Sequence, residues 1–182
     1  MQEVQKWFAL TVRHQHERQT ELALRFKGWE TLAPTFRARS RWSDRVKELE
    51  LPLFAGYVFC RFSLREKGQV QSTPGVVSVV GFGGIPAAVE DREIAGIQAM
   101  ATSGLPLSPW PTLRAGDRVR VERGPLRGLE GTLLRDGGAL RLAVGVELLQ
   151  RSVCVELTAD MIAPMREVGL ARTPMSYSSA RR

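Results

Sequence analysis

The side chains that could perform chemistry in this chain are few and widely spaced. His14 and His16 are the two histidines, and too few further donors stand near them to complete a metal site. Cys60 and Cys154 lie in apolar alternating segments, so we expect both to be buried core residues. The glycines of residues 81–84 are not followed by the helix and lysine of a phosphate-binding loop, and they predict a turn. The sequence therefore predicts a binding protein rather than a small hydrolase, with no metal and no cofactor.

Aromatic side chains gather in the segment LPLFAGYVFCRF, residues 51–62. Strand alternation predicts that Tyr57 and Phe59 share one face, whereas Phe54, Cys60 and Phe62 share the other. We expect the Tyr57/Phe59 face to be an exposed contact surface. The alternative is that a second layer of the fold buries it.

Basic side chains gather in residues 37–47, which predict a hairpin or an exposed loop. Against one acid, Asp44, this segment carries Arg37, Arg39, Arg41, Arg45 and Lys47. Alternating arginines around Trp42 suit single-stranded nucleic acid, because phosphate contacts and base stacking then add together. The alternative is an ordinary solvated surface.

The elements that must position these residues form an α+β domain over residues 1–102. Alternation over 6–13 predicts a strand with Phe8, Leu10 and Val12 on one face. A helix is expected from Glu17 to Trp29, with an apolar face formed by Leu22, Ala23, Phe26 and Trp29. Residues 64–72 predict a short helix, 76–82 a strand, and 90–100 a helix. The order βαββαβα predicts an antiparallel α/β sandwich.

A second, all-β domain is expected over residues 113–165. Residues 103–112 contain three prolines and predict a linker that lets the two domains fold and move independently. Beyond them, about five short alternating runs separated by glycine turns predict a small SH3-like barrel. Residues 166–182 predict a disordered tail.

Charge is distributed evenly between the two predicted domains. The formal net charge is +7, but residues 1–104 hold 14 basic against 11 acidic side chains, and residues 113–165 hold 8 against 7. Neither domain is uniformly basic, as a general nucleic-acid binder would be. No apolar run has the length of a membrane span, and the first residues lack the pattern of a signal peptide, so a cytoplasmic location is expected.

The strand FAGYVF at 54–59, the turn TPGV at 73–76 and the segment GDRVRVERGPLRGLEGTLL at 116–134 together resemble the NusG-like transcription factors. In that family an N-terminal domain is followed by a KOW domain, and the resemblance covers residues 5–165. The pattern FGG-x-P at 82–86 is similar to specialised paralogues of the RfaH or LoaP type. Residues 65–72, REKGQVQS, lack the His-Thr-Thr polymerase contact of some paralogues.

The resemblance implies three binding surfaces, on a protein expected to be a monomer. Contact with the clamp helices of RNA polymerase is implied for Phe54, Tyr57 and Phe59, with Trp7 and Phe82 at the rim. Contact with the non-template DNA strand is implied for Arg13, His14, Arg18, Arg39, Arg41, Trp42 and Arg45. Contact of the KOW domain with a small-subunit ribosomal protein or with termination factor Rho is expected at Arg120, Pro125, Leu126 and Leu129. The alternative for Pro125, Leu126 and Leu129 is that these loop residues fill the open end of the barrel.

The function that these features predict is transcription elongation or antitermination, by a protein that couples RNA polymerase to other factors. The alternative is a KOW-containing RNA-binding or ribosome-binding protein, which would leave residues 5–100 unexplained. Whether the chain is a general factor or an operon-specific paralogue, and whether its KOW domain is autoinhibitory, stays open at the level of sequence.

Overall fold

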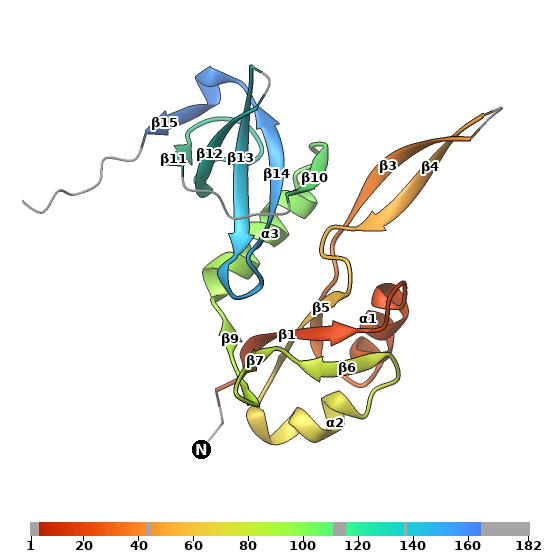
Figure 1. Cartoon of the computed structure of the whole chain (residues 1–182). Helices are drawn as coiled ribbons and strands as arrows, with labels where there is room; N and C mark the ends of the chain where they lie inside the picture. Colours follow the sequence, from red (N-terminus) through yellow and green to blue (C-terminus); the bar gives the residue numbers. More distant parts are fainter. Residues whose placement is uncertain (1–3, 43–44, 111–115, 137, 165–182) are drawn as a thin grey trace, which may run out of the picture.

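The computed structural model describes residues 4–42, 45–110, 116–136 and 138–164. Within these residues, a mixed helix and strand part is followed by a part built of β-strands (Figure 1). The predicted fold class, an α+β domain before a sheet-rich barrel, is confirmed. The predicted tail, 166–182, lies outside the described residues.

The N-terminal sheet is antiparallel, with the strand order β2-β5-β1-β6 and with β9 also paired to β1. Its strands are β1 (Lys6–Val12), β2 (Glu30–Leu32), β5 (Tyr57–Phe62), β6 (Val76–Val79) and β9 (Ala88–Val89). The central strand, β1, is apolar on both faces, as a strand covered on both sides must be. Strands β1 and β5 therefore present two buried faces.

One face of this sheet is covered by α1 (Glu17–Phe26) and α2 (Lys67–Gln71), and we call it the helix-covered face. The short turn η1 (Leu64–Glu66) precedes α2 and buries no side chain. The helix-covered face buries Phe8, Leu10, Val58, Cys60 and Phe62 against Leu24 and Val70 from the helices. The rings of Phe8 and Phe62 lie 4.6 Å apart. The predicted facing of β1 and the short helix near residues 64–72 are both confirmed.

The apolar face predicted for α1 is wrong at Leu22 and Phe26, whereas Trp29 is buried as predicted but lies beyond the end of the helix at Phe26. Leu22 is 53% exposed and Phe26 is 95% exposed, whereas Leu24 is fully buried. The first turn decides the rotation of the helix, because the buried Glu17 accepts a hydrogen bond from the backbone N–H of Gly56, at 2.8 Å from Oε1. The spacing of apolar residues alone could not reveal that a glutamate would occupy the inner position.

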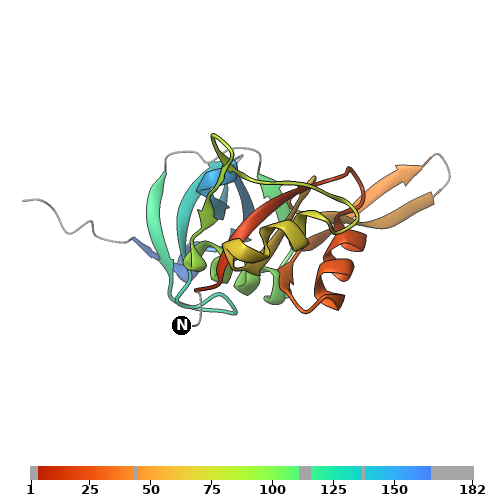
Figure 2. The ribbon, with the colours of Figure 1, turned by 90° about the horizontal axis from the view of Figure 1, so that it is seen from below.

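Two hairpins leave the N-terminal sheet. Strands β3 (Thr35–Trp42) and β4 (Arg45–Pro52) form a two-stranded ribbon that extends away from the body (Figures 1 and 2). This agrees with the hairpin expected for the basic segment. The second hairpin is small and joins β7 (Gly81–Phe82) to β8 (Ile85–Pro86).

Helix α3 (Asp91–Thr102) leads into a six-stranded antiparallel sheet, which we call the barrel, with the order β10-β14-β13-β12-β11-β15. The strands and short helical turns of this part are β10 (Leu107–Trp110), β11 (Asp117–Val121), β12 (Glu130–Asp136), β13 (Ala139–Val146), η2 (Glu147–Leu149), β14 (Arg151–Leu157), η3 (Ala159–Met161) and β15 (Ile162–Pro164). Its interior is aliphatic and includes Val119, Val121, Leu142, Val146 and Val155.

Part of the predicted linker belongs to the barrel. Residues 107–110 form β10 and pair with β14, with Pro109 opposite Val153. Pro109 is tolerated because β10 lies at the end of the strand order, where one side needs no ladder donor. The prolines indicated a linker, but pairing with a strand more than 40 residues later decided the structure.

Candidate functional site

Three residues of the expected polymerase surface, Trp7, Phe54 and Phe59, form one buried aromatic cluster. The rings of Phe54 and Phe59 meet edge to face, with centroids 5.2 Å apart. Strand alternation predicted these two rings on opposite faces, and that prediction is wrong. Residues 53–56 form a turn that contains Gly56 at φ +83°, and this turn brings Phe54 over the face of Phe59.

Helix α3 and the barrel together cover this aromatic cluster, so we call this side of the sheet the barrel-covered face. One continuous apolar core runs from the aromatic cluster through Ile94 and Ile97 of α3 into the barrel. A Cβ added at Gly96 would lie 2.8 Å from Cγ1 of Val144 and 3.5 Å from Cδ1 of Leu129. Gly96 therefore permits the close approach of α3 to the barrel.

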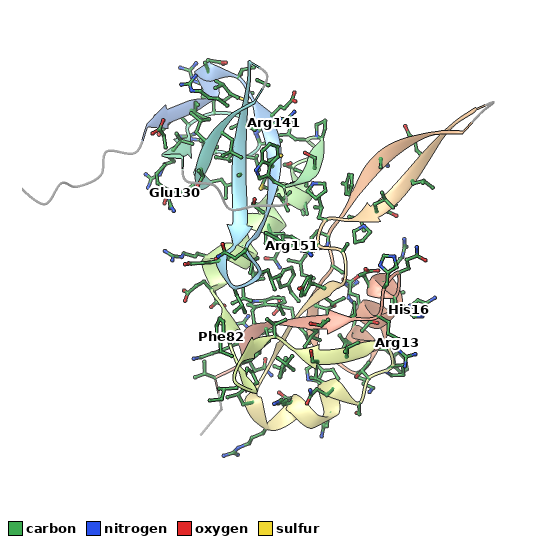
Figure 3. All side chains as sticks on the ribbon, in the orientation of Figure 1. Arg13, His16, Phe82, Glu130, Arg141 and Arg151 are labelled. Carbon is green, nitrogen blue, oxygen red and sulfur yellow. The ribbon has the colours of Figure 1, made fainter. Side chains whose placement is uncertain are left out.

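Polar contacts join the barrel to the N-terminal domain at two places. The guanidinium of Arg151 lies 5.1 Å from the ring centroid of Tyr57, and its Nη1 donates to the carbonyl oxygen of Ala55 at 3.1 Å. Arg151 lies between the two parts of the molecule (Figure 3). The backbone N–H of Glu147 donates to Oε1 of Glu93 on α3 at 2.9 Å.

The expected exposure of the Tyr57/Phe59 face is corrected by this arrangement. Phe59 is fully buried, Trp7 is 4% exposed, and Tyr57 is half-buried beneath Arg151. Of the five expected residues, Phe82 alone is exposed, at 72%. Sequence reasoning missed Gly96, Glu93 and Arg151, because nothing in their local sequence indicates a contact between distant segments.

The expected nucleic-acid surface lies at the opposite end of the sheet from Phe82 (Figure 3). Arg13 and His14 are exposed between β1 and α1, and Arg18 is exposed in the first turn of α1. Nη1 of Arg18 lies 3.2 Å from Oε2 of Glu50, which brings the start of α1 to the base of the β3–β4 hairpin. The remaining expected side chains, Arg39, Arg41, Trp42 and Arg45, are not among the described side chains.

A groove of about 970 Å³ lies beside this surface, and sequence reasoning did not identify it. It is lined by α1, the base of the β3–β4 hairpin and the barrel, including Leu22, Phe36, Leu51 and Trp110. Leu22 and Leu51 are 53% and 39% exposed. Three segments far apart in the sequence form this groove, so local sequence gave little indication of it. The one indication was Leu22, whose helical spacing was interpreted as a core position.

The four residues expected to bind a KOW partner separate into different environments. Arg120 pairs with Glu130, and this contact holds the pKa of the Glu130 carboxyl below its ordinary value. Pro125 is exposed, but Leu126 is 2% exposed and belongs to the core, as in the alternative in which it plugs the barrel. Leu129 is half-buried and reaches toward Gly96 of α3.

Both cysteines are buried and free, as predicted. Burial raises the pKa of the Cys60 thiol to about 12. The sulfur of Cys154 lies 3.1 Å from Oγ of Ser108. Among the described residues, no group of three or more histidine, cysteine or acidic side chains is placed to hold a metal ion. The described helices include none with the length and apolarity needed to cross a membrane.

A family model and one solved structure agree with this architecture. The family model described as "Transcription termination factor nusG" matches residues 5–98. A solved structure described as "Domain interaction in Thermotoga maritima NusG" has 22% sequence identity and a TM-score of 0.54, and the match covers 90% of this chain and 98% of that one. An MjSpt4:Spt5 complex has 13% identity and a TM-score of 0.30, covering 87% of this chain and 97% of that one. The chain belongs to the NusG family of transcription factors.

Proposed function

We propose that this protein is a transcription elongation and antitermination factor that binds the clamp helices of RNA polymerase through the aromatic cluster of its barrel-covered face. The observation that carries the proposal is the composition of this face. Helices α1 and α2 pack on the other side of the sheet, whereas this face presents Trp7, Phe54 and Phe59 together beneath α3 and the barrel. Rigid aromatics give a large contact area at little entropic cost, which is typical of interface hot spots.

Polymerase and barrel compete for the barrel-covered face. Phe59 is fully buried beneath α3 and the barrel in the closed arrangement, so polymerase reaches it only after this cover has moved away. The apparent affinity of the whole chain for polymerase then equals the intrinsic affinity of the open form multiplied by the fraction of molecules that are open. A factor that stabilises the open form therefore strengthens polymerase binding.

The basic residues near the start of α1 and in the β3–β4 hairpin serve to contact the non-template DNA strand. Arg13, His14 and Arg18 are exposed while the barrel is closed, so this contact needs no opening. Changing Arg39, Arg41 and Arg45 to Ala should lower the salt dependence of binding to a nucleic-acid scaffold by about 0.7 in logarithmic slope for each lost contact with a single strand. An unchanged slope would assign the hairpin to solvated surface.

The barrel serves as the site for a second factor, either a small-subunit ribosomal protein or Rho, at the exposed Pro125 and at Leu129. Movement of the barrel away from the N-terminal domain frees Leu129 from α3. RNA polymerase and the second factor therefore both favour the same open form. The alternative of an RNA-binding barrel has less support because neighbouring acids pair with its arginines. Arg118 and Arg120 approach Glu130, and Arg141 lies 3.1 Å from Glu156. The proposed role places the protein in the cytoplasm, with the transcribing polymerase.

Addition of the full chain to a paused elongation complex tests the proposal. The expected result is altered pause duration and termination, together with co-purification of the protein with RNA polymerase. Tyr57→Ala should reduce both, because Tyr57 lies at the rim of the aromatic cluster. Phe26→Ala is the matched control, since Phe26 is exposed on α1 away from this face. A chain that neither binds polymerase nor changes pausing or termination would refute the proposed function.

A further inference from the structure

The small β7–β8 hairpin presents two large apolar side chains to solvent. Phe82 is 72% exposed and Ile85 is 73% exposed. The two residues are directly opposite each other in the antiparallel register, so their side chains lie on the same face of the hairpin. The hairpin protrudes from the body of the N-terminal domain (Figure 2). Neighbouring apolar side chains on one protruding hairpin differ from the isolated exposed apolar residues common on protein surfaces.

The backbone holds this apolar pair in a fixed geometry. Gly83 and Gly84 have φ angles of +57° and +80°, the left-handed values that a tight two-residue hairpin turn requires. A Cβ at Gly81 would overlap the carbonyl oxygen of Ile85, so the two strands approach as closely as glycine permits. A contact made by a hairpin of this kind loses little conformational entropy on binding.

The hairpin adjoins the barrel-covered face without being covered itself. Its base is anchored to β1, where the N–H of Val80 donates to the carbonyl oxygen of Ala9 at 2.8 Å, and Val89 pairs with Trp7. Val80 also packs against the apolar core that contains the aromatic cluster. The exposed pair is thus continuous with the surface that the barrel hides.

We propose that Phe82 and Ile85 form a docking point for RNA polymerase that is available while the barrel is closed. The hairpin makes the first contact, and the barrel leaves the aromatic cluster afterwards. The inference rests on the proposed function and deepens it, because it assigns the order of events at that interface. The occupant is an apolar surface of polymerase beside the site for the aromatic cluster, since the hairpin and the cluster are anchored on the same strand, β1.

Association kinetics of the full chain with immobilised RNA polymerase test this order. The variant Phe82→Ser/Ile85→Ser should lower the association rate constant about tenfold in the closed protein. The same double change should have an effect of about twofold or less when Gly96→Leu forces the barrel away from α3, because the aromatic cluster then meets polymerase directly. Val77→Ser is the matched control, since Val77 is 59% exposed on β6, and it should leave the rate unchanged in both backgrounds.

The outcomes separate this inference from the proposed function. Equal rate losses in the two backgrounds, a loss confined to the dissociation rate, or no loss at all would overturn the docking point while the proposed function stands. Absence of binding by both the parent and Gly96→Leu would refute the proposed function, and the docking point with it. Phe82→Leu keeps an apolar side chain and should keep the parental rate, and thermal melting should show that every variant is folded.

Discussion

The two faces of the N-terminal sheet are equally buried, but different parts of the chain cover them. The helix-covered face packs Phe8 and Phe62 beneath α1 and α2, which lie close to those strands in the sequence. The barrel-covered face packs Trp7 and Phe59 beneath α3 and the barrel, whose strands begin at residue 107. Both aromatic layers have exposed fractions of only a few per cent. Burial alone therefore does not separate a permanent core from a binding surface.

The difference between the faces lies in what must happen to expose them. Helix α1 is joined to the sheet on both sides by short connections, and its removal would leave the sheet without its inner layer. We propose that the barrel, with its aliphatic interior, leaves the sheet and keeps its core when polymerase binds. A cover that retains its own core when it moves can act as a competitor for a partner.

The largest expected effect comes from truncating one aromatic residue on each face. Phe62→Ala should lower the free energy of unfolding by about 3–5 kcal/mol, because it leaves a cavity in a core that cannot separate. Phe59→Ala should cost roughly half as much, since opening of the barrel relieves part of the loss. Urea unfolding measures both values.

The order of the two variants should be reversed when polymerase affinity is measured in place of stability. Phe59→Ala should lose affinity, whereas Phe62→Ala should keep it under conditions where circular dichroism shows a folded protein. Loss of affinity in folded Phe62→Ala, with parental affinity in Phe59→Ala, would exchange the roles of the two faces.

The next effect concerns the closeness of α3 to the barrel. Gly96→Leu should push the barrel away and raise polymerase affinity about tenfold, which corresponds to about 1.4 kcal/mol. The helix itself should tolerate the change, because glycine is a poor helix former. Gly96→Ala is the control with a smaller side chain and should give a smaller gain. Equal or reduced affinity in Gly96→Leu would show that closure does not limit binding.

A weaker effect is expected from the polar contacts at the edge of the interface. Arg151→Ala removes the cation–π contact with Tyr57 and the hydrogen bond to Ala55, which together contribute about 1 kcal/mol at a partly exposed site. Polymerase affinity should therefore rise about fivefold. Arg135→Ala removes an exposed barrel arginine and is the matched control. Identical affinities for the two variants would leave Arg151 without a role in closure.

The smallest effect is a pH dependence that belongs to the helix-covered face. Burial raises the pKa of Cys60 from the ordinary 9.0 to about 12, so the folded state holds the thiol proton more tightly than the unfolded state. This contribution to stability is present below pH 9 and is lost as the pH rises toward 12. Between pH 8 and 9.5 the loss should be somewhat under 1 kcal/mol. Denaturant unfolding of Cys60→Ala should lack this part of the alkaline slope, and an unchanged slope would contradict the assignment.

Local pattern in the sequence predicted the elements with regular spacing. The strand at residues 6–13, the helix at 90–100 and the β-rich second half were all predicted, because alternation or three- and four-residue spacing reports directly on a half-buried element. The prediction failed where a single contact overrode the spacing. Glu17 rotated α1 by bonding to Gly56, and the turn at 53–56 moved Phe54 to the face of Phe59.

The sequence by itself determined the class of fold, the family resemblance and the residue types of the aromatic cluster. Only the tertiary structure decided that α3 and the barrel cover this cluster and that Phe82 stays exposed beside it. The physical reason is that the interface joins segments separated by many residues, such as Gly96 with Val144 and Ala55 with Arg151. The spacing of apolar residues along one segment indicates that one of its faces must be buried. It does not indicate which distant segment buries that face.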